Sequence, residues 1–250
     1  MPHSQRKHGE SGFYHVVAKG DGGQILFEND TDRRRYIDIL AESINGYRIE
    51  LHSYCLMNNH VHLLVKDEAR DLSTFMKQLN EGYAMYFAKK TQRVGRVFQR
   101  PFWSEPIDAD SYFLCTLRYI HANPEPAGIC QARDYPWSSY QAYFRGSSLV
   151  ETRLALDMIG GASKFEEFSS SGGSYAKPFK GSKLFRHHGS DELVSIAIAS
   201  LGRDVLNNMR SMMPEERDPY IQALFEKGFS AAEISRVTGL GLSPVHRALR

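Results

Sequence analysis

Four short strand-like segments alternate with two longer helical ones between residues 13 and 107. Aromatic and β-branched residues mark the strand-like segments, whereas apolar residues at intervals of three and four mark the helical ones. Their order is strand, helix, strand, strand, helix, strand. This order predicts an α+β domain of the ferredoxin-like type, with both helices on one face of the sheet and the other face open to a ligand. The strand-like segments are residues 13–18, 47–57, 61–66 and 102–107, and the helical ones are residues 30–43 and 72–90.

Polar residues stand where the helices of this pattern should begin. We expect Asp30 or Thr31 to cap the first helix, because a short oxygen-bearing side chain accepts the free N–H groups of a first turn. Asp110 is placed to cap one further helix, which ends before Pro124.

The composition is that of a globular protein with a substantial core. The 250 residues are 42% hydrophobic and 24% charged, which fits one large domain or two smaller ones. The formal net charge of +2 is weak support for a nucleic-acid partner unless positive charge is clustered locally. The three cysteines form no CxxC pair, and no segment has the pattern of a signal peptide or a membrane span. We therefore expect a reduced, cytoplasmic setting and no membrane partner.

The character of the chain changes after about residue 148. Serine and glycine are frequent in residues 160–183, so we predict a linker with short helices over residues 149–190. From residue 191 onward the pattern is helical throughout. We therefore expect a first domain over residues 1–148 and a small all-α domain over residues 191–250.

Two histidines stand two residues apart at the third strand-like segment. Side chains alternate between the two faces of a strand, so His60 and His62 share one face while Val61 turns to the core. Two neighbouring imidazoles on a rigid strand can bind one divalent metal ion. The same pattern also fits histidines that only meet solvent or stack on a helix, and the pair alone does not decide between the two.

A tyrosine and an asparagine stand four residues apart near the end of the last predicted helix of the first domain. Helical spacing puts Tyr119 and Asn123 on one side, where a hydroxyl and an amide oxygen can point at one centre. The alternative is that Tyr119 packs in the core and Asn123 closes the helix before Pro124. Tyr112, seven residues earlier on nearly the same face, is a second candidate for a reactive tyrosine.

Other histidines and tyrosines fit different roles better. His15 lies in the first strand-like segment and could approach the site, although a structural role fits it better. His121 points away from the side of the helix that carries Tyr119, so we do not expect it to bind a metal ion. Tyr83 and Tyr86 belong to the preceding helix and are expected to pack or to contact DNA.

Five sequence blocks in the first 145 residues occur together in one known family. In order, they are YHVVAKG, LHSYCLMNNHVHLLV, GRVFQRPFWSE, LRYIHANPEPAG and DYPWSSYQAY. Together they make residues 12–145 resemble the REP-associated tyrosine transposases, which are relatives of the small insertion-sequence transposases in the HUH endonuclease superfamily. The resemblance implies a ferredoxin-like catalytic domain that binds Mg²⁺ or Mn²⁺ and acts on DNA.

The resemblance also implies roles for residues at the matching positions. It places His60 and His62 at the metal-ligand positions and Tyr119 at the position of the nucleophile. Asn123 matches the position of the third ligand, which is often glutamine in related transposases, so its shorter side chain predicts looser metal binding. The implied reaction is metal-dependent cleavage of single-stranded DNA through a 5′-phosphotyrosine intermediate, followed by strand transfer. Such a transesterification needs no nucleotide cofactor.

Positive charge is concentrated just before the last strand-like segment. Residues 86–100 contain five basic residues, no acidic residue and several interleaved aromatic ones. Phosphates pair with basic side chains and unstacked bases lie on aromatic rings, so we expect this segment to contact single-stranded DNA. A solvated basic loop is the alternative. The candidate contacts are Lys89, Lys90, Arg93, Arg96, Arg100 and Trp103.

Residues 229–250 have the rhythm of a helix-turn-helix. Ser230 is placed to cap one helix and Ser243 to cap the next, with glycines in the turn between them. The segment resembles the helix-turn-helix modules of bacterial regulators and the DNA-binding end of replication initiators. Ser243, His246 and Arg247 would then face DNA, whereas a plain helical hairpin is the alternative.

Together these features favour a transposase-like enzyme that nicks DNA and transfers the cut strand, with single-stranded, hairpin or repeat DNA as its partner. Two alternatives stay open. One is a non-catalytic regulator that binds nucleic acid through the ferredoxin-like sheet and the helix-turn-helix, and the other is a degenerate transposase that retains only binding. The resemblance also leaves open whether the protein acts as a monomer or a homodimer.

Overall fold

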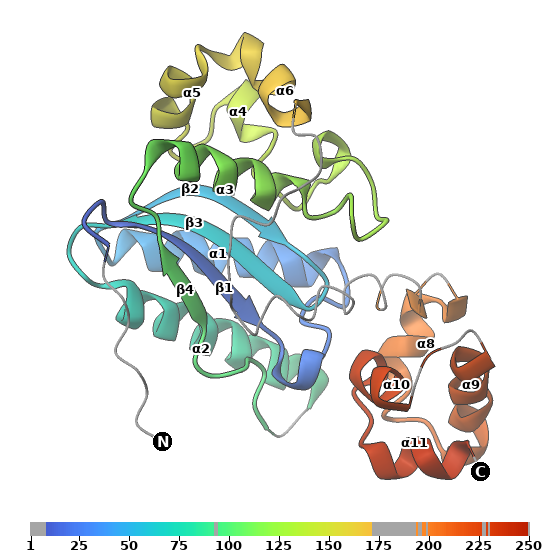
Figure 1. The fold of residues 1–250 in the computed structure, drawn as a ribbon. Helices are drawn as coiled ribbons and strands as arrows, with labels where there is room; N and C mark the ends of the chain where they lie inside the picture. Colours follow the sequence, from blue (N-terminus) through green and yellow to red (C-terminus); the bar gives the residue numbers. More distant parts are fainter. Residues whose placement is uncertain are drawn as a thin grey trace.

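The computed structural model describes residues 9–92, 95–171, 194, 197–198, 200–226, 229 and 231–249. In this part of the chain, Figure 1 shows a sheet with helices on both faces and a separate helical bundle near the C-terminus. No helix of the described residues is both long and apolar enough to cross a membrane. Residues 172–193, which hold much of the predicted linker, lie outside the described residues, as do Arg93 and Ser230.

Four antiparallel strands form one sheet in the order β2-β3-β1-β4. They are β1 (Phe13–Lys19), β2 (Ile49–Leu56), β3 (His60–Asp67) and β4 (Trp103–Pro106). A short turn joins β2 to β3, whereas β1 lies between β3 and β4, so neighbouring strands are brought together from distant parts of the sequence. This order, with one helix after β1 and one after β3, confirms the predicted ferredoxin-like α+β fold.

Two helices cover one face of the sheet and a third crosses the other (Figure 1). α1 (Asp30–Asn45) and α2 (Leu72–Thr91) pack against each other on the first face. Apolar side chains such as Leu63 of β3 and Phe75 of α2 are fully buried in the core there. α3 (Asp110–Ala122) lies on the opposite face against β2 and β3, so the face that we predicted to be open is partly covered.

Two helices of the first domain, α1 and α3, begin with caps other than the predicted ones, whereas α2 begins at Leu72 after Asp71, as predicted. Asn29 caps α1, instead of Asp30 or Thr31. Its side chain accepts a hydrogen bond from the backbone N–H of Asp32 over 3.1 Å, and the Asp32 carboxylate accepts one from the Asn29 N–H over 3.2 Å. α3 begins at Asp110 itself, after a residue with no capping side chain. Composition marks the neighbourhood of a helix start, but the backbone path selects the side chain that reaches the free N–H groups.

Residues 149–170, which we assigned to a linker with short helices, pack onto the first domain. They contain α5 (Arg153–Ile159) and α6 (Ala162–Ser170), which follow α4 (Ala142–Arg145). Phe165 of α6 is fully buried and stacks on Tyr143 of α4 with ring centroids 4.4 Å apart. The first core therefore extends through α6. Serine and glycine content could not reveal this, because the burial of one aromatic ring depends on partners elsewhere in the chain.

The described C-terminal residues form a bundle with a core of its own (Figure 1). Its helices are α8 (Arg203–Asn208), α9 (Pro214–Glu226), α10 (Ala231–Thr238) and α11 (Leu242–Ala248). Ile234 of α10 and Val245 of α11 are fully buried in this core beside α9. Gly241 caps α11 instead of the predicted Ser243. The turn before it passes through Gly239, whose φ of 66° favours glycine.

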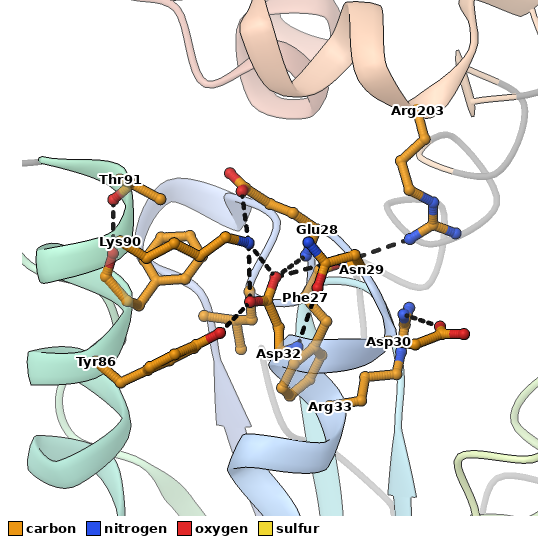
Figure 2. Close-up of polar contacts among 12 residues, drawn as sticks. Phe27, Glu28, Asn29, Asp30, Asp32, Arg33, Tyr86, Lys90, Thr91 and Arg203 are labelled. Carbon is orange, nitrogen blue, oxygen red and sulfur yellow. Dashed lines mark hydrogen bonds and ion pairs between the residues drawn. The ribbon is translucent and has the colours of Figure 1, made fainter.

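The bundle meets the first domain at the loop that follows β1. Ile25, just after the short turn η1 (Asp21–Gly23), is buried with the core of the bundle rather than with the sheet. Arg203 of α8 donates to the carbonyl oxygen of Phe27 over 3.4 Å (Figure 2). On its other side, the loop bonds the turn between β2 and β3, because Gly20 N–H donates to the carbonyl oxygen of Asn59 over 2.8 Å. One loop therefore contacts both the bundle and the strand that carries the paired histidines.

Candidate active site

Three histidines lie side by side on the face of the sheet that α3 crosses. In the pairing of β1 with β3, Val17 lies opposite His62 and Lys19 lies opposite His60. Opposed residues point to the same face and alternate residues share it, so His15 joins the histidine pair on this face. All three rings are buried, with an exposure of 6% for His60, 1% for His62 and 0% for His15.

The histidine rings form a continuous hydrogen-bonded row. His60 Nε2 lies 2.9 Å from His62 Nε2, and His62 Nδ1 lies 2.9 Å from His15 Nε2. At the other end of the row, His60 Nδ1 lies 2.9 Å from Oδ1 of Asn59. Burial, with a smaller effect from the charge of His60, lowers the pKa of His15 to about 3. The His15 ring is therefore neutral near neutral pH.

Tyr119 reaches this row from α3. Its ring meets the rings of His62 and His15 edge to face, with centroids 5.7 Å and 6.0 Å away. The residue is buried, with an exposure of 9%, and packs with the first core. The fold thus brings the predicted nucleophile to the predicted metal-ligand histidines, which belong to a different part of the sequence.

Asn123 lies one turn beyond Tyr119, at the end of α3. Its amide nitrogen donates to the carbonyl oxygen of Tyr119 over 2.8 Å and to that of Ile120 over 3.4 Å. The residue therefore closes the helix, which is the role that we weighed against metal binding. The amide nitrogen is the donor in both bonds, and the amide oxygen takes part in neither. Metal binding by Asn123 stays a prediction.

The donor atoms of the site fit a divalent cation. His60 Nε2 and His62 Nε2 are 2.9 Å apart. Two neighbouring nitrogen ligands of an octahedral ion lie about this far apart when their metal bonds are about 2.1 Å long and meet at a right angle. Among the described residues, no three or more His, Cys, Asp or Glu side chains are grouped to hold a metal ion. The amide oxygen of Asn123 is a chemically suitable further ligand.

Three further residues lie on this face that the sequence pattern alone did not assign to the site. His15, which we expected to be structural, bonds His62 directly. Trp103 of β4 meets the ring of His15 edge to face, with centroids 5.3 Å apart, which places this predicted DNA contact beside the histidine row. Lys19 lies on the same face, opposite His60. The block YHVVAKG already indicated this placement. His15 and Lys19 are an even number of residues apart, so they lie on one side of a strand.

The other candidate tyrosines have structural bonds. Tyr112 lies beside Glu105 of β4, and burial followed by the charge and hydrogen bond of Glu105 raises the pKa of its hydroxyl. A raised pKa keeps the phenol protonated and reduces the amount of reactive phenolate. The hydroxyls of Tyr83 and Tyr86 both donate hydrogen bonds within the first domain. Tyr119 is therefore the tyrosine that the fold places against the histidine row.

His121 points away from the site, into the core between α3 and α6. Its Nε2 lies 2.8 Å from Ser139 Oγ and 3.1 Å from Ser53 Oγ, and its ring meets that of Phe165 edge to face. Burial lowers the pKa of His121 to about 3. The folded protein therefore holds this ring neutral, whereas a histidine of the unfolded chain titrates near pH 6.5.

Acid is expected to destabilise the first domain through His121. The stabilisation is complete above about pH 6.5 and is lost as the pH falls toward the folded pKa, by roughly 1.4 kcal/mol per pH unit. When the pH is lowered from about 7.5 to 5, we expect the free energy of unfolding of His121→Gln to fall by roughly 2 kcal/mol less than that of the wild-type protein. Urea unfolding followed by tryptophan fluorescence measures this, because Trp103 and Trp137 both pack on the first core. The exposed His246 provides the control variant His246→Gln. If the free energy of unfolding depends on pH equally in wild type and in His121→Gln, His121 is not the cause of the acid destabilisation.

The predicted basic segment is exposed over much of its length. Lys89, Arg96 and Arg100 are all exposed, and Arg100 forms an ion pair with Glu81 of α2 over 3.3 Å. Arg93 lies outside the described residues. Contact between this segment and DNA stays a prediction.

Lys90, in contrast, turns to a buried carboxylate (Figure 2). Its Nζ lies 2.8 Å and 2.7 Å from the two carboxylate oxygens of Asp32 and 3.1 Å from Oε2 of Glu28. Asp32 is fully buried and also accepts a hydrogen bond from the hydroxyl of Tyr86 over 2.7 Å. This cluster ties α2 to the start of α1. Lys90 therefore has a structural partner already, and the sequence could not show this because Asp32 is far away along the chain.

The three predicted contacts of the bundle lie on the outer side of α11. Ser243, His246 and Arg247 are exposed, whereas Val245 and Ala248 are buried in the bundle core. In a helix-turn-helix, the second helix presents its outer face to DNA. Their contact with DNA stays a prediction.

Residues 10–123 match the family model described as "Transposase IS200 like". The matched segment contains the four strands, α1 to α3, and the predicted nucleophile and metal-ligand residues. Comparison with proteins of curated function found no match.

The solved structures that are similar to the chain include two transposases. A REP-associated tyrosine transposase bound to a REP hairpin has a TM-score of 0.52 and 15% identity, over 60% of this chain and 89% of the other. A candidate transposase from Deinococcus radiodurans has a TM-score of 0.34 and 19% identity, over 43% of this chain and 88% of the other, which is too distant for further argument. The first likeness supports the fold, and the family match covers the domain that has this fold. The domain over residues 10–123 therefore belongs to the IS200-like transposase family.

Proposed function

We propose that this protein is a metal-dependent tyrosine transposase that cuts single-stranded DNA at a hairpin or repeat and transfers the cut strand. The observation that carries the proposal is the contact of Tyr119 with the row that contains His60 and His62. The family of the domain supports DNA as the substrate. The hairpin in the related REP-associated structure supports a hairpin as the form of that DNA.

His60, His62 and Asn123 would hold the cation, Mg²⁺ or Mn²⁺. Two imidazoles with one amide oxygen suit Mn²⁺ better than Mg²⁺, because Mg²⁺ prefers oxygen ligands and gives up its water reluctantly. When bound, such an ion polarises a phosphate oxygen and neutralises charge that develops in the transition state.

Tyr119 supplies the nucleophile in this proposal. Its hydroxyl oxygen forms a bond to phosphorus and loses its proton, while the bond from phosphorus to the preceding 3′ oxygen breaks and that oxygen takes up a proton. The products are a 5′-phosphotyrosine and a free 3′-OH. The phosphodiester is exchanged rather than hydrolysed, so a 3′-OH of another strand can attack the phosphotyrosine and release Tyr119.

Neighbouring groups favour a DNA strand at this position. Lys19, opposite His60 in the sheet, adds a positive charge to the face, which favours an anionic ligand. Trp103 is half-buried beside His15 and offers an aromatic surface on which an unstacked base can lie. The exposed Lys89, Arg96 and Arg100 would bind backbone phosphates.

A covalent adduct tests this proposal. Full-length protein is incubated with Mn²⁺ and a set of labelled hairpins with single-stranded tails, and a denaturing gel reveals label that moves with the protein. We expect an adduct with wild-type protein and with the surface control Asp38→Ala, and none with His60→Ala or His62→Ala. Proteolysis after Arg118 separates Tyr112 from Tyr119, so mass spectrometry identifies the tyrosine that carries the nucleotide. Hairpin binding without an adduct, in either Mn²⁺ or Mg²⁺, would instead support a regulator or a degenerate transposase.

A further inference from the structure

The histidine row is held at both ends by side chains that belong to neither the predicted ligands nor the nucleophile. Asn59 stands at one end, 2.9 Å from His60 Nδ1, and His15 stands at the other, 2.9 Å from His62 Nδ1. Between them, the two Nε2 atoms of His60 and His62 face each other at 2.9 Å. A neutral imidazole carries one proton, on one of its two nitrogens. The end residues therefore influence which nitrogen of each inner ring is unprotonated.

The hydrogen bond with Asn59 determines which nitrogen of a neutral His60 ring carries the proton. Its amide nitrogen donates to the carbonyl oxygen of Gly23 over 3.3 Å, so its amide oxygen is the atom that faces His60. An amide oxygen only accepts hydrogen bonds, and the proton of a neutral His60 ring therefore lies on Nδ1. His60 Nε2 then carries a lone pair, as a metal ligand must.

His15 can form a hydrogen bond with either tautomer of His62. Without a cation, His60 Nε2 is an acceptor, so His62 Nε2 carries the proton and His62 Nδ1 accepts one from His15 Nε2. With a cation on both Nε2 atoms, the proton of His62 must lie on Nδ1 instead. His15 Nε2 must then accept that proton in a hydrogen bond, and its own proton lies on Nδ1. Each ring keeps one proton in both states, so the change is one of tautomer and not of charge.

We propose that Asn59 and His15 are positioning residues whose hydrogen bonds stabilise the tautomers in which His60 and His62 present both Nε2 atoms to one divalent cation. This inference rests on the proposed function, because that function makes the histidine pair the metal ligands. Partners of this kind, behind the ligands themselves, fix ring orientation and tautomer at metal sites, and their loss typically weakens metal binding about 10–100-fold.

Matched variants separate hydrogen bonding from packing at each end. His15→Phe keeps a ring beside Trp103 and Tyr119 but has no acceptor, whereas His15→Gln carries an amide oxygen the same number of bonds from Cα as Nε2. Asn59→Leu removes the acceptor of His60, and Asn59→Asp keeps an oxygen there.

The affinity of each full-length variant for Mn²⁺ alone is measured by electron paramagnetic resonance of the free ion. We expect the Kd to rise about 10–100-fold in His15→Phe and Asn59→Leu, and to return close to the wild-type value in His15→Gln and Asn59→Asp.

The tautomers of the wild-type protein are read directly by long-range ¹H–¹⁵N NMR of the imidazoles, with Zn²⁺ as a diamagnetic probe. We expect His60 to keep its proton on Nδ1 with and without Zn²⁺. His62 should change from a proton on Nε2 to a proton on Nδ1 when Zn²⁺ is added. This measurement needs no variant, so it decides the question even if a substitution prevents folding.

The outcomes distinguish this inference from the proposed function. Mn²⁺ affinity that is unchanged in His60→Ala removes the metal site and with it the proposed function. Affinity that is lost in His60→Ala but unchanged in both His15→Phe and Asn59→Leu overturns the inference alone. A His62 tautomer that Zn²⁺ leaves unchanged also overturns it.

Discussion

Replacing Tyr119 by phenylalanine is expected to abolish the covalent adduct with hairpin DNA while the fold is retained. Phenylalanine keeps the ring that meets His62 and His15 edge to face and removes only the hydroxyl oxygen. Because that oxygen is the proposed nucleophile, adduct formation should fall by roughly 10³-fold or more. The rate of adduct formation on denaturing gels measures the effect, and hairpin affinity measured in parallel should be unchanged.

Tyr112→Phe is the matched control, because it makes the same change on the same helix. Tyr112 donates to a carboxylate of β4 and its raised pKa keeps it protonated, so the variant should form the adduct at the wild-type rate. An adduct that survives in Tyr119→Phe but is lost in Tyr112→Phe would transfer the role of nucleophile to Tyr112. An adduct that persists in both variants would exclude both tyrosines of α3.

Asp32→Ala is expected to destabilise the first domain by roughly 3 kcal/mol. Asp32 is fully buried and accepts hydrogen bonds from Lys90, from Tyr86 and from the backbone N–H of Glu28 and Asn29 (Figure 2). Removal of the Asp32 carboxylate leaves these donors without their acceptor. Removing one partner of a buried ion pair is strongly destabilising, because the other charge stays buried and unpaired. The Lys90 side chain is 28% exposed and can regain some hydration, so we place the effect at the low end of the range for buried pairs. Urea unfolding followed by tryptophan fluorescence measures the change.

Two controls accompany this prediction. Asp38 is exposed on the same helix, so Asp38→Ala should change stability by less than about 0.5 kcal/mol. Lys89 and Lys90 are adjacent, and only Lys90 bonds Asp32, so Lys90→Ala should destabilise the domain and Lys89→Ala should not. Equal stability of Asp32→Ala and wild type would show that the cluster does not hold α1 to α2.

The order of strands and helices in the first domain was predictable because it depends on local period. The alternation around Val61 and the apolar spacing of α2 follow from neighbours only a few residues away. Helix starts were less predictable, since Asn29 and the residues after it are all polar and only the path of the chain selects the cap. The packing of α6 was not predictable either, because the burial of Phe165 depends on Tyr143 and on the core beneath α4.

The candidate site was predictable in parts but not as a whole. A strand of period two pairs His60 with His62, and a helix of period 3.6 pairs Tyr119 with Asn123. Neither period says that the two pairs meet, and the resemblance to a known family supplied that link. The place of His15 in the row required the register of β1 against β3, which no local pattern specifies.

The sequence by itself determined the local elements, the face on which the paired histidines lie and the family to which the first domain belongs. Only the tertiary structure decided that α3 crosses the face we expected to be open, that His15 completes the histidine row and that Lys90 turns to Asp32. The physical reason is the range of the interactions. Side-chain period depends on residues within one or two turns, whereas strand order, ring contacts and buried ion pairs join groups that are distant along the chain.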